Sequence, residues 1–548
     1  MPWIFKQADS LKSKLLSAKF GISPITASLL INRGIEEEED VELFLYPTLD
    51  KLYDPFLLSG VSEGVERLKR ALANGEKVLV YGDYDVDGVT GTALLLLVLR
   101  KAFGDRISYF IPHRVKEGYG LHYEIIKYAR DKGFSLVVTV DCGINNGDVV
   151  SEAVKMGIDF IITDHHIPGE KLPEGAIVIN PKIKGCKYPF KELAGVGVAW
   201  KFASAFAGKP LVEFLDLVAL GTVADVVPLV GENRILVKEG FKLLERGIRP
   251  GIRELLREAG VRPFRKIDEW LVSFIMAPRL NAAGRIDIAD LSVNLLLSSS
   301  YFRVRELSKK LNELNSKRKG IEEKILMEAQ DKVDGSPIIF LYKSGWHLGV
   351  LGIVASRLVE RYGKPAFLMC KSGKKVKGSA RGVEGFRIDE ALAYCSGVLD
   401  SFGGHELAGG FSLKEERLQD FRDLLLEFSK SKPFSPFAEE WIDGRLEGKD
   451  LTDSLAKEIS SLSPWGKGNP RPLFLLEDVI LQVSGSNGYK VFRGIKNDVV
   501  FNIYSPKEDL SGLSGEKVVL VGFWGIDSWT GMPCFRVEAL FNGGGGLS

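Results

Sequence analysis

The sequence predicts an α/β protein in which a parallel-sheet domain is joined by a long helix to a smaller α/β domain, with a small β-barrel at the C-terminus. Over residues 77–180, short β-branched runs alternate with helical segments, as in βαβ units. Residues 303–333 form one charged helical pattern without proline, and short strands separated by turns follow residue 437. Such short strands are typical of a small barrel.

The first domain is expected to occupy residues 51–300, after a helical N-terminal extension at residues 1–50. A Gly/Asp-rich loop is predicted to lead from its first strand into a helix over residues 91–102, and helical patterns dominate residues 191–297. The predicted strands are residues 77–81, 107–111, 136–140, 160–162 and 176–179. This order predicts a sheet followed by a helical part within one domain.

The long helix is expected to connect two domains at residues 301–334, although a solvated surface helix would carry the same charged pattern. The second domain, residues 335–432, opens with a predicted strand at residues 337–342. A Ser/Pro-containing linker at residues 431–437 precedes the barrel, residues 437–542. Several domains are also what a chain of 548 residues requires.

Composition excludes several classes of protein without choosing a function. The longest apolar stretch, residues 93–99, is far shorter than the roughly 20 residues that span a bilayer, and no secretory signal is expected. The five cysteines include no Cys-x-x-Cys pair, which favours a reducing cytoplasm over a disulfide framework or a zinc ribbon. Because the formal net charge is only +1, a site for a polyanion must be a local basic patch.

Three acidic loops carry the strongest chemical signal, because each directly follows a predicted strand. They contain DYDVDG at residues 83–88, Asp141, and the triplet DHH at residues 164–166. The carboxyl ends of parallel strands share one edge of a sheet, so these side chains are expected to converge. Carboxylates with one or two imidazoles suit Mn²⁺ or Mg²⁺ better than zinc, and two such ions can promote phosphodiester hydrolysis. For any single aspartate, helix capping or turn formation is the simpler interpretation.

Four motifs resemble those of the DHH phosphoesterase family, in the same order: DYDVDG, Asp141, the DHH triplet, and ADVVPL at residues 224–229. Within that family, further stretches are similar to RecJ-type exonucleases: LLINRGI at 29–35, YFIPHRVKEGYG at 109–120, APRLNAAGR at 277–285, GGH at 403–405 and PWGKGNP at 464–470. The resemblance implies a DHH catalytic domain before the connector helix. It further implies a DHHA1 substrate-binding domain after that helix and an OB-like nucleic-acid-binding domain as the barrel.

The resemblance also implies roles for single residues. Two ions, Mn²⁺ or Mg²⁺, are expected to be bound. The implied metal ligands are Asp83, Asp85, Asp141, His165 and Asp225. His166 is expected to face the scissile phosphate, and Asp164 is expected to orient His165. For Asp87 two interpretations stay open, since it could ligate an ion or only shape the turn.

Basic and glycine-rich segments are candidates for contacts with a nucleic acid. In APRLNAAGR, Arg279 is expected to assist catalysis by neutralising charge on a phosphate, although structural salt bridges would also explain these arginines. The alternating lysines of residues 371–381 could likewise be a solvated strand face. The residues expected to bind substrate are Arg114, Asn281, Arg285, Ser379, Arg381, Gly404 and His405.

The resemblance implies a 5′-to-3′ exonuclease that degrades single-stranded DNA to mononucleotides in recombination and DNA repair. Single-strand-binding protein and a helicase are the implied protein partners, and a monomer without membrane contact is expected. One alternative is a phosphodiesterase acting on short oligoribonucleotides or cyclic dinucleotides, because the catalytic motifs would be the same. A second is a non-enzymatic replication scaffold, which the intact ligand set disfavours. The N-terminal extension, the connector helix and the barrel favour a polymeric substrate.

Overall fold

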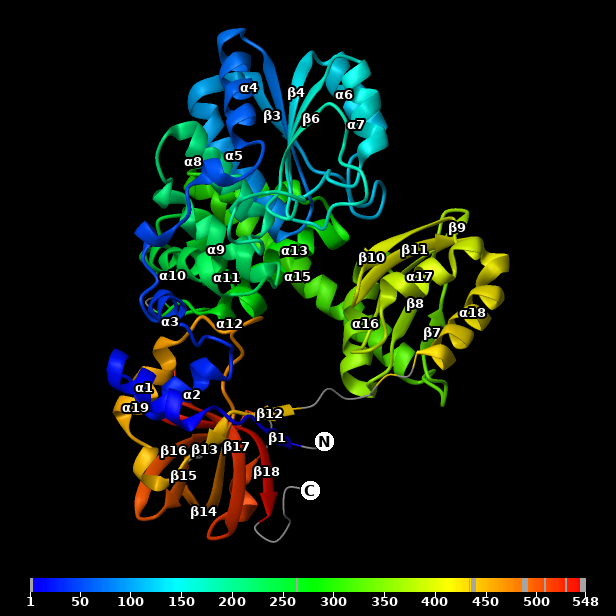
Figure 1. The fold of residues 1–548 in the computed structure, drawn as a ribbon. Helices are drawn as coiled ribbons and strands as arrows, with labels where there is room; N and C mark the ends of the chain where they lie inside the picture. The colour runs from blue at the N-terminus through cyan, green and yellow to red at the C-terminus, as the bar shows by residue number, and fades with distance from the viewer. Residues whose placement is uncertain are drawn as a thin grey trace.

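A computed structural model describes residues 3–262, 265–432, 434, 440–484, 491–506, 509–527 and 530–542. Figure 1 shows the first α/β domain at the top, the second at its side, and the barrel below, with the connector helix α15 (Tyr301–Gln330) between the two α/β domains. The predicted fold class is therefore confirmed. Most of the linker predicted at residues 431–437 lies outside the described residues.

The first domain is built on a five-stranded parallel sheet with the strand order β3-β2-β4-β5-β6. Its strands are β2 (Lys77–Gly82), β3 (Ile107–Phe110), β4 (Phe134–Val140), β5 (Asp159–Thr163) and β6 (Ala176–Ile179). All five predicted strands are thus present. Successive residues of β2 point to opposite faces, so Val78 and Val80 enter one core while Leu79 and Tyr81 enter another.

Helices cover both faces of this sheet (Figure 1). The helices α4 (Val61–Ala73), α5 (Val86–Phe103) and α8 (Gly195–Ala207) cover one face, and α6 (Tyr123–Asp131) and α7 (Gly147–Lys155) cover the other. Helix α5 begins at Val86 rather than at residue 91, because Asp85 caps it. The Asp85 carboxylate accepts hydrogen bonds from the backbone N–H groups of Asp87 (3.0 Å) and Gly88 (3.2 Å). The acidic motif is therefore a helix N-terminus that directly follows a strand.

A helical part completes the first domain. It contains α9 (Leu215–Ala224), α10 (Gly231–Arg246), α11 (Pro250–Glu258), α12 (Glu269–Leu271), α13 (Ala277–Ile286) and α14 (Asp290–Leu297). A π-helical turn, η5 (Val272–Met276), leads into α13, whose first turn contains Pro278. Proline has no N–H to donate, which favours a local change of helical pitch at this point. Helix α13 then packs along the connector α15.

The second domain is a mixed five-stranded sheet with the order β10-β11-β9-β8-β7, in which only β7 and β8 are parallel. Its strands are β7 (Ile339–Tyr342), β8 (Ala366–Ser372), β9 (Lys375–Arg381), β10 (Ser401–His405) and β11 (Ala408–Leu413). Helix α16 (Leu348–Tyr362) covers one face together with the end of α15, while α17 (Ile388–Tyr394) and α18 (Leu418–Ser431) cover the other. Strand β10 is exposed along its whole length and borders the first domain.

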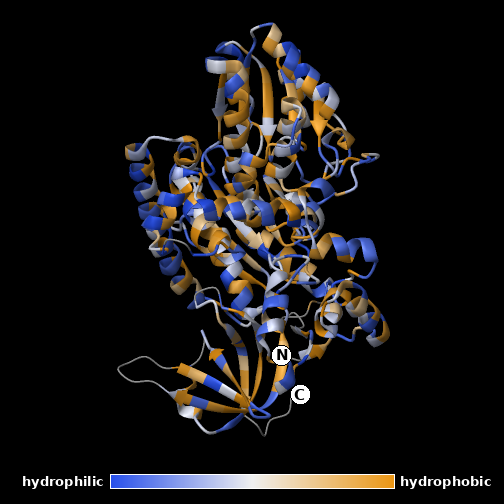
Figure 2. Cartoon of the chain, turned by 90° about the vertical axis from the view of Figure 1, so that its left-hand side faces the viewer, coloured by the Kyte–Doolittle hydropathy of each residue, from blue (hydrophilic) through white to orange (hydrophobic). Residues whose placement is uncertain are grey.

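The C-terminal strands close into a barrel because β14 pairs with both β15 and β17. The strands are β13 (Gly444–Arg445), β14 (Phe474–Ser484), β15 (Val491–Lys496), β16 (Val499–Tyr504), β17 (Lys517–Ile526) and β18 (Pro533–Asn542), and helix α19 (Asp453–Ser461) packs beside them. Figure 2 shows hydrophobic residues along the strands and hydrophilic residues on the outer sides of the helices.

The N-terminal extension packs on the barrel. Helices α1 (Ser10–Phe20), α2 (Pro24–Ile31) and α3 (Glu38–Leu45) share one hydrophobic core with the barrel strands. The extension is not purely helical, since β1 (Trp3–Phe5) pairs in parallel with β12 (Glu440–Ile442). A strand of three residues shows no periodicity, and its partner lies far away in sequence. Among the described helices, none alone is long and apolar enough to cross a membrane; the bent pair α1 and α2 meets the length and composition criteria only jointly.

Candidate metal centre

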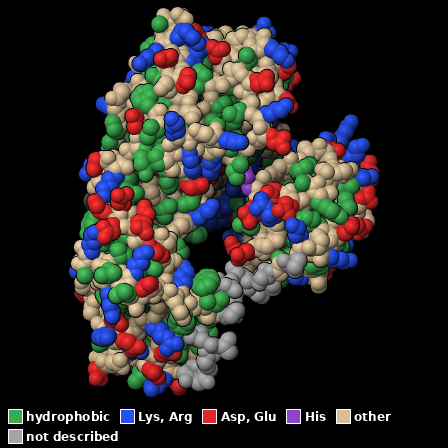
Figure 3. Space-filling model, in the orientation of Figure 1, with side chains coloured by type: hydrophobic (Ala, Val, Ile, Leu, Met, Phe, Trp, Pro, Cys, Tyr) green, Lys and Arg blue, Asp and Glu red, His purple; other side chains and the backbone are tan. Residues whose placement is uncertain are grey.

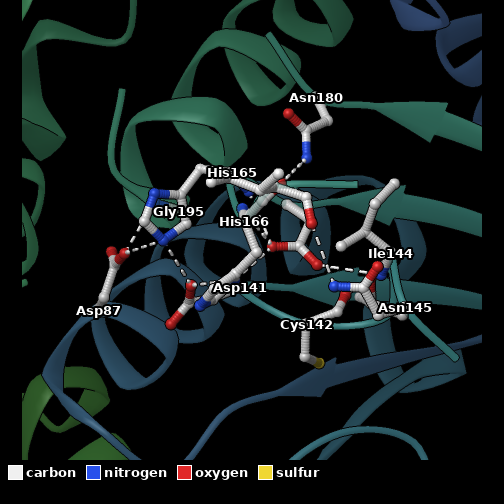
Figure 4. A network of polar contacts seen from close by, with 12 residues as sticks. Asp87, Asp141, Cys142, Ile144, Asn145, His165, His166, Asn180 and Gly195 are labelled. Atoms are coloured by element: carbon white, nitrogen blue, oxygen red, sulfur yellow. Dashed lines mark hydrogen bonds and ion pairs between the residues drawn. The ribbon is translucent and has the colours of Figure 1, made fainter. Parts of the chain in front are cut away.

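The acidic motifs converge at the carboxyl edge of the first sheet. Asp83 follows β2, Asp141 follows β4 and His165 lies just beyond β5, while Asp225 follows helix α9. Three overlapping groups have potential ligand atoms within 4.8 Å of one another: Asp83 with Asp85 and Asp141, Asp141 with His165 and His166, and Asp87 with His165 and Asp225. Figure 4 shows the two histidines above Asp141, with Asp87 to one side.

Several polar atoms in this cluster are buried and have no hydrogen-bond partner among the described residues. They are Asp83 Oδ1, Asp141 Oδ1, Asp225 Oδ2 and both ring nitrogens of His165. The Nε2 atom of His165 lies 3.2 Å from Asp141 Oδ1 and 3.5 Å from Asp225 Oδ2. Leaving so many buried groups unsatisfied is unfavourable unless a cation joins them. Carboxylate oxygens with one imidazole are donors that suit Mn²⁺ and Mg²⁺, so the residues fit these ions.

The electrostatics of the cluster also favour cations. Burial and the neighbouring aspartates raise the pKa of Asp83, Asp141 and Asp225 well above the usual range for a carboxyl group. Burial and the charge of His166 lower the pKa of His165 to about 3, so its ring is neutral at pH 7. A neutral imidazole can donate a lone pair to a metal ion, and a cation nearby stabilises the ionised carboxylates.

Two non-glycine residues of this edge have a left-handed backbone. Asp141 has φ of 61° and Val226, next to Asp225, has φ of 60°. Such conformations are costly for residues with a side chain, above all for a β-branched valine, and they occur preferentially at functional sites. The start of α8 is shaped to match: a Cβ at Gly195 would lie 2.7 Å from the Cβ of Asp141. The backbone is thus specialised to hold the Asp141 carboxylate in place.

Asp164 contacts the ring of His166 and not the ring of His165, which corrects the expected role. Its carboxylate lies 2.8 Å from His166 Nδ1 and accepts hydrogen bonds from the backbone N–H groups of Ile144 and His165. Burial acts to lower the pKa of His166, but the hydrogen bond and charge of Asp164 outweigh it and leave that pKa raised. Asp164 therefore fixes the His166 ring and shifts its protonation equilibrium toward the cationic form.

Asp87 lies with its carboxylate between two helices. Its two oxygens accept hydrogen bonds of 2.7 Å from the backbone N–H groups of Gly195 and Val196, at the start of α8. One oxygen also lies 3.9 Å from His165 Nε2. Burial and the charge of Asp85 raise its pKa to about 7. The structural interpretation of Asp87 accordingly has direct support, while a place near a metal ion stays compatible with the geometry.

Arginines from both α/β domains gather beside the cluster. Arg114 lies over the ring of Tyr84, 4.6 Å from its centroid, and Arg285 donates to the backbone carbonyl of Gly349 in the second domain. Arg381 donates to the hydroxyls of Ser379 (3.1 Å) and Ser356 (3.2 Å). Burial and the charge of Arg114 lower the pKa of Arg285 to about 9 and that of Arg381 to about 10, so both remain cationic at pH 7. Figure 3 shows a hollow between the two domains, with blue side chains on its wall and a histidine at its rim.

The GGH motif reaches the same place from the second domain. The ring of His405 stacks on that of His166, with centroids 5.7 Å apart and planes at 14°. A Cβ at Gly404 would lie 2.3 Å from the backbone oxygen of Ala408, so only glycine fits where β10 runs beside β11. The motif therefore brings an imidazole from one domain against the catalytic edge of the other.

The predicted residues of α13 behave differently from one another. Arg279 donates to Asn312 of α15 (2.9 Å) and to the backbone carbonyl of Ile275, and burial followed by Arg318 lowers its pKa. Asn281 is partly buried in the same helix. The hydrogen bonds of Arg279 thus join α13 to α15 and to the preceding turn rather than to a residue of the metal centre. Of the three, Arg285 is the one whose charge interacts with Asp85.

Other residues near the site were not singled out by the sequence. The Tyr119 hydroxyl lies 3.2 Å from His166 Nδ1. The positive charges of Lys182 and Lys467 act to lower the pKa of Asp225. Tyr119 and Lys467 lie within the stretches YFIPHRVKEGYG and PWGKGNP, so those motifs held a usable signal. The charge of Arg318 of α15 lowers the pKa of both Arg279 and Arg285. Arg318 lies in a charged helical pattern, so the sequence did not distinguish it from the other charged residues of that helix.

Comparison with known proteins agrees with this geometry. Residues 77–222 match the DHH family, N-terminal domain, residues 335–431 match the DHHA1 domain, and residues 442–498 match the RecJ OB domain. The chain is 39% identical to the single-stranded-DNA-specific exonuclease RecJ of Bacillus subtilis, over 96% of this chain and 69% of that protein. It is 36% identical to the RecJ of Escherichia coli, over 83% of each.

The solved structures include similar folds with metal ions. The crystal structure of RecJ in complex with Mn²⁺ from Thermus thermophilus superposes with a TM-score of 0.84 at 30% identity, covering 99% of this chain and 79% of that one. A second structure of that protein, in complex with Mg²⁺, has a TM-score of 0.77 at 29% identity, covering 98% and 78%. Shared sequence, shared domains and shared fold lead to one conclusion: the chain belongs to the RecJ family of DHH exonucleases.

Proposed function

We propose that this protein is a metal-dependent exonuclease that degrades single-stranded DNA from its 5′ end to mononucleotides. The observation that carries the proposal is the cluster of buried ligand atoms of Asp83, Asp141, His165 and Asp225, which have no hydrogen-bond partner among the described residues. Figure 3 shows basic side chains, Lys or Arg, on the wall of the hollow between the two α/β domains. Family membership supports the same activity, because the curated relatives are named single-stranded-DNA-specific exonucleases.

The metal centre would be formed by Asp83, Asp85, Asp141, His165 and Asp225. Two Mn²⁺ or Mg²⁺ ions bound there would activate a water molecule and stabilise the leaving oxygen of the phosphodiester. The chain itself can supply a cation at His166, because the Asp164 carboxylate lies 2.8 Å from His166 Nδ1 and raises the pKa of that ring, which favours its protonated form. A cation so placed favours the extra negative charge that the phosphate acquires in the transition state.

Recognition of the 5′ end is assigned to Arg114, Ser379 and Arg381. A terminal phosphate monoester carries more charge than an internal diester and has one more free oxygen. Two guanidiniums and a hydroxyl can pair with that excess charge, and charge-assisted hydrogen bonds of this kind are among the strongest in proteins. Arg285 of α13 belongs to the same group of charges, since, besides burial, Arg114 and Arg381 both lower its pKa, and His405 of β10 stacks on His166.

The barrel is proposed to hold the strand beyond the cleft. A groove of about 1500 Å³ separates the barrel from the helical part of the first domain. Phe492 of β15 and Tyr504 of β16 line one wall, and Lys242, Lys266 and Trp270 line the other. In barrels of this type the second and third strands bind oligonucleotides, and here these are β15 and β16. Exposed aromatic rings can stack bases without regard to sequence.

The cellular setting follows from the family. Recombination and DNA repair require single-stranded DNA to be removed, and a helicase together with single-strand-binding protein would supply and cover such strands. We propose these partners, a monomeric state and a cytoplasmic location on that ground alone.

The test uses a 5′-phosphorylated DNA strand of defined length with Mn²⁺ or Mg²⁺, and separately with EDTA. Release of mononucleotides from the 5′ end, dependent on the metal, is expected. A circular strand of the same composition serves as the control, since an exonuclease leaves it intact. Faster hydrolysis of cyclic dinucleotides or of di- and triribonucleotides than of the DNA strand would instead favour the small-substrate phosphodiesterase.

A further inference from the structure

We propose that Lys467 binds the DNA phosphate that follows the scissile one on its 3′ side, and so positions the strand as it leaves the metal centre toward the barrel. This inference rests on the proposed exonuclease function. Lys467 lies in the loop PWGKGNP, residues 464–470, which belongs to the C-terminal part of the chain. The loop nevertheless reaches the catalytic edge of the first domain.

The loop is docked on the segment that follows Asp225. The backbone carbonyl of Lys467 accepts a hydrogen bond of 2.8 Å from the backbone N–H of Leu229. The two neighbouring glycines pack closely there: a Cβ at Gly466 would lie 2.9 Å from the Leu229 side chain, and one at Gly468 would lie 3.3 Å from Pro228. Lys467 is therefore held within a few residues of a metal ligand, although the two lie more than two hundred residues apart in sequence.

Hydrogen bonds of Asn469 and Pro470 also fix the C-terminal end of the loop. The Asn469 side chain donates hydrogen bonds of 2.9 Å to the backbone carbonyls of Leu462 and Pro464. Arg33 of the N-terminal extension donates to the Asn469 side chain (3.0 Å) and to the Pro470 carbonyl (2.7 Å). A loop fixed at its base in this way presents its exposed side chain in a defined position.

The Lys467 side chain is free for a ligand. It is exposed, and no carboxylate of the described residues forms an ion pair with it. Lys182, the other lysine near Asp225, lies 3.6 Å from Glu192. Burial, Asp87 and Asp85 raise the pKa of Asp225, while the charges of Lys182 and Lys467 act to lower it, which agrees with the docking of the Lys467 loop beside this segment.

The order of charges along the cleft gives the register. The charge of Arg114 acts to lower the pKa of Asp83, and the charge of Asp85 acts to raise the pKa of Arg285. The arginines therefore adjoin the group formed by Asp83, Asp85 and Asp141. Lys467 lies toward the other end of the cluster, because its backbone pairs with Leu229 in the segment that follows Asp225. A strand with its 5′ phosphate at the arginines and its scissile phosphate at the metal ligands brings its next phosphate to Lys467. Lysine binds a phosphate as a point charge and carries no base preference, as a sequence-independent nuclease requires.

The experiment compares a 5′-phosphorylated dinucleotide with the trinucleotide that contains one more phosphate. In the wild type, the extra phosphate should raise kcat/KM for cleavage of the first linkage; in Lys467→Gln, the ratio of kcat/KM for the trinucleotide to that for the dinucleotide should fall by about tenfold. Lys467→Arg should keep most of the ratio. Lys449→Gln, an exposed lysine elsewhere in the C-terminal part, should keep all of it.

A neutral methylphosphonate at the second linkage of the trinucleotide provides the second arm. It should slow the wild type but add little to the loss already caused by Lys467→Gln, because both changes remove one interaction. A ratio that Lys467→Gln leaves unchanged, whether both rates fall or neither does, would overturn the inference. If the wild type hydrolyses neither substrate nor a long strand, the proposed function itself is wrong.

Discussion

His405 of the second domain stacks on His166 of the first, across the cleft that separates the two α/β domains. The contact joins the imidazole that Asp164 orients to the domain that carries Ser379 and Arg381. We expect His405→Ala to lower kcat/KM on single-stranded DNA by roughly tenfold to hundredfold, because the second domain loses a direct contact with the catalytic edge. Metal binding, measured by calorimetry, should be unchanged. Unaltered kinetics would show that the stacking has no part in catalysis.

Asp85→Asn and Asp141→Asn should each lower the rate of hydrolysis by several orders of magnitude. Asparagine keeps the cap of α5 at position 85 and tolerates the left-handed backbone at position 141, so the fold should persist. Removing one like charge should raise the melting temperature of the metal-free protein, while Mn²⁺ should no longer stabilise it as it does the wild type. Asp148→Asn, on the exposed start of α7, is the matched control. Near-normal turnover of either variant in Mn²⁺ would rule out its role as a ligand.

Arg381→Ala should remove most of the preference for a 5′-phosphorylated strand over a 5′-hydroxyl strand. A charge-assisted contact contributes about 1.5–3 kcal/mol, which corresponds to a preference of roughly tenfold to hundredfold. The measurement is the ratio of initial rates on the two substrates. Arg422→Ala, at a partly exposed arginine of the same domain whose guanidinium lies 3.6 Å from the Asp334 carboxylate, should leave the ratio intact. If Arg381→Ala also leaves the ratio of initial rates intact, Arg381 does not select the 5′-phosphorylated end.

Trp270→Ala combined with Tyr504→Ala should weaken the binding of long single strands. These side chains are 38% and 50% exposed on opposite walls of the groove beside the barrel, and stacking of one base contributes about 1–3 kcal/mol. The dissociation constant of a long strand should rise at least tenfold, while that of a trinucleotide should not change. Tyr128→Ala, at an exposed tyrosine of α6, is the control. Equal losses on both lengths would place the rings outside the strand's path.

Lys238→Met should stabilise the protein in a pH-dependent way. Burial and the charges of Arg234 and Lys242 lower the pKa of Lys238 to about 7. The unfolded chain then binds more protons than the folded chain between pH 7 and the ordinary pKa of lysine, so stability rises with pH across that window. The cost of the buried charge is fully present at pH 7 and below. The melting temperature of the variant should therefore exceed that of the wild type most at pH 6.5, and the difference should shrink at pH 9.

The sequence predicted the sheet and the convergence of ligands because both depend on local pattern. Strands rich in valine and isoleucine, each followed by an acidic residue, define an edge without any knowledge of tertiary contacts. Asp85 shows the limit of this reasoning, since the Gly/Asp-rich pattern around it indicates a loop and concealed its capping of α5. The start of the helix was accordingly expected too late.

Features that depend on distant partners escaped prediction. Asp164 was expected to orient His165, but two adjacent histidines give no sign of which ring a flexible carboxylate will meet. Arg318 lies in the helix expected to connect two domains, but the charged pattern of that helix does not show that α13 packs along it. Strand β1 has only three residues and becomes a strand through its pairing with β12. In each case the deciding contact lies outside the segment that was interpreted.

The packing of the N-terminal extension on the barrel has a consequence for folding during translation. Arg33 and Asp443, which face each other in this packing, are 410 residues apart. At translation rates of about 5–20 residues per second, helices α1 to α3 emerge from the ribosome roughly 20 to 80 seconds before their barrel exists. Leu29 and Leu30, fully buried in the folded molecule, would meanwhile face water or a chaperone. Residues synthesised before the barrel thus reach their final packing only after the barrel has formed.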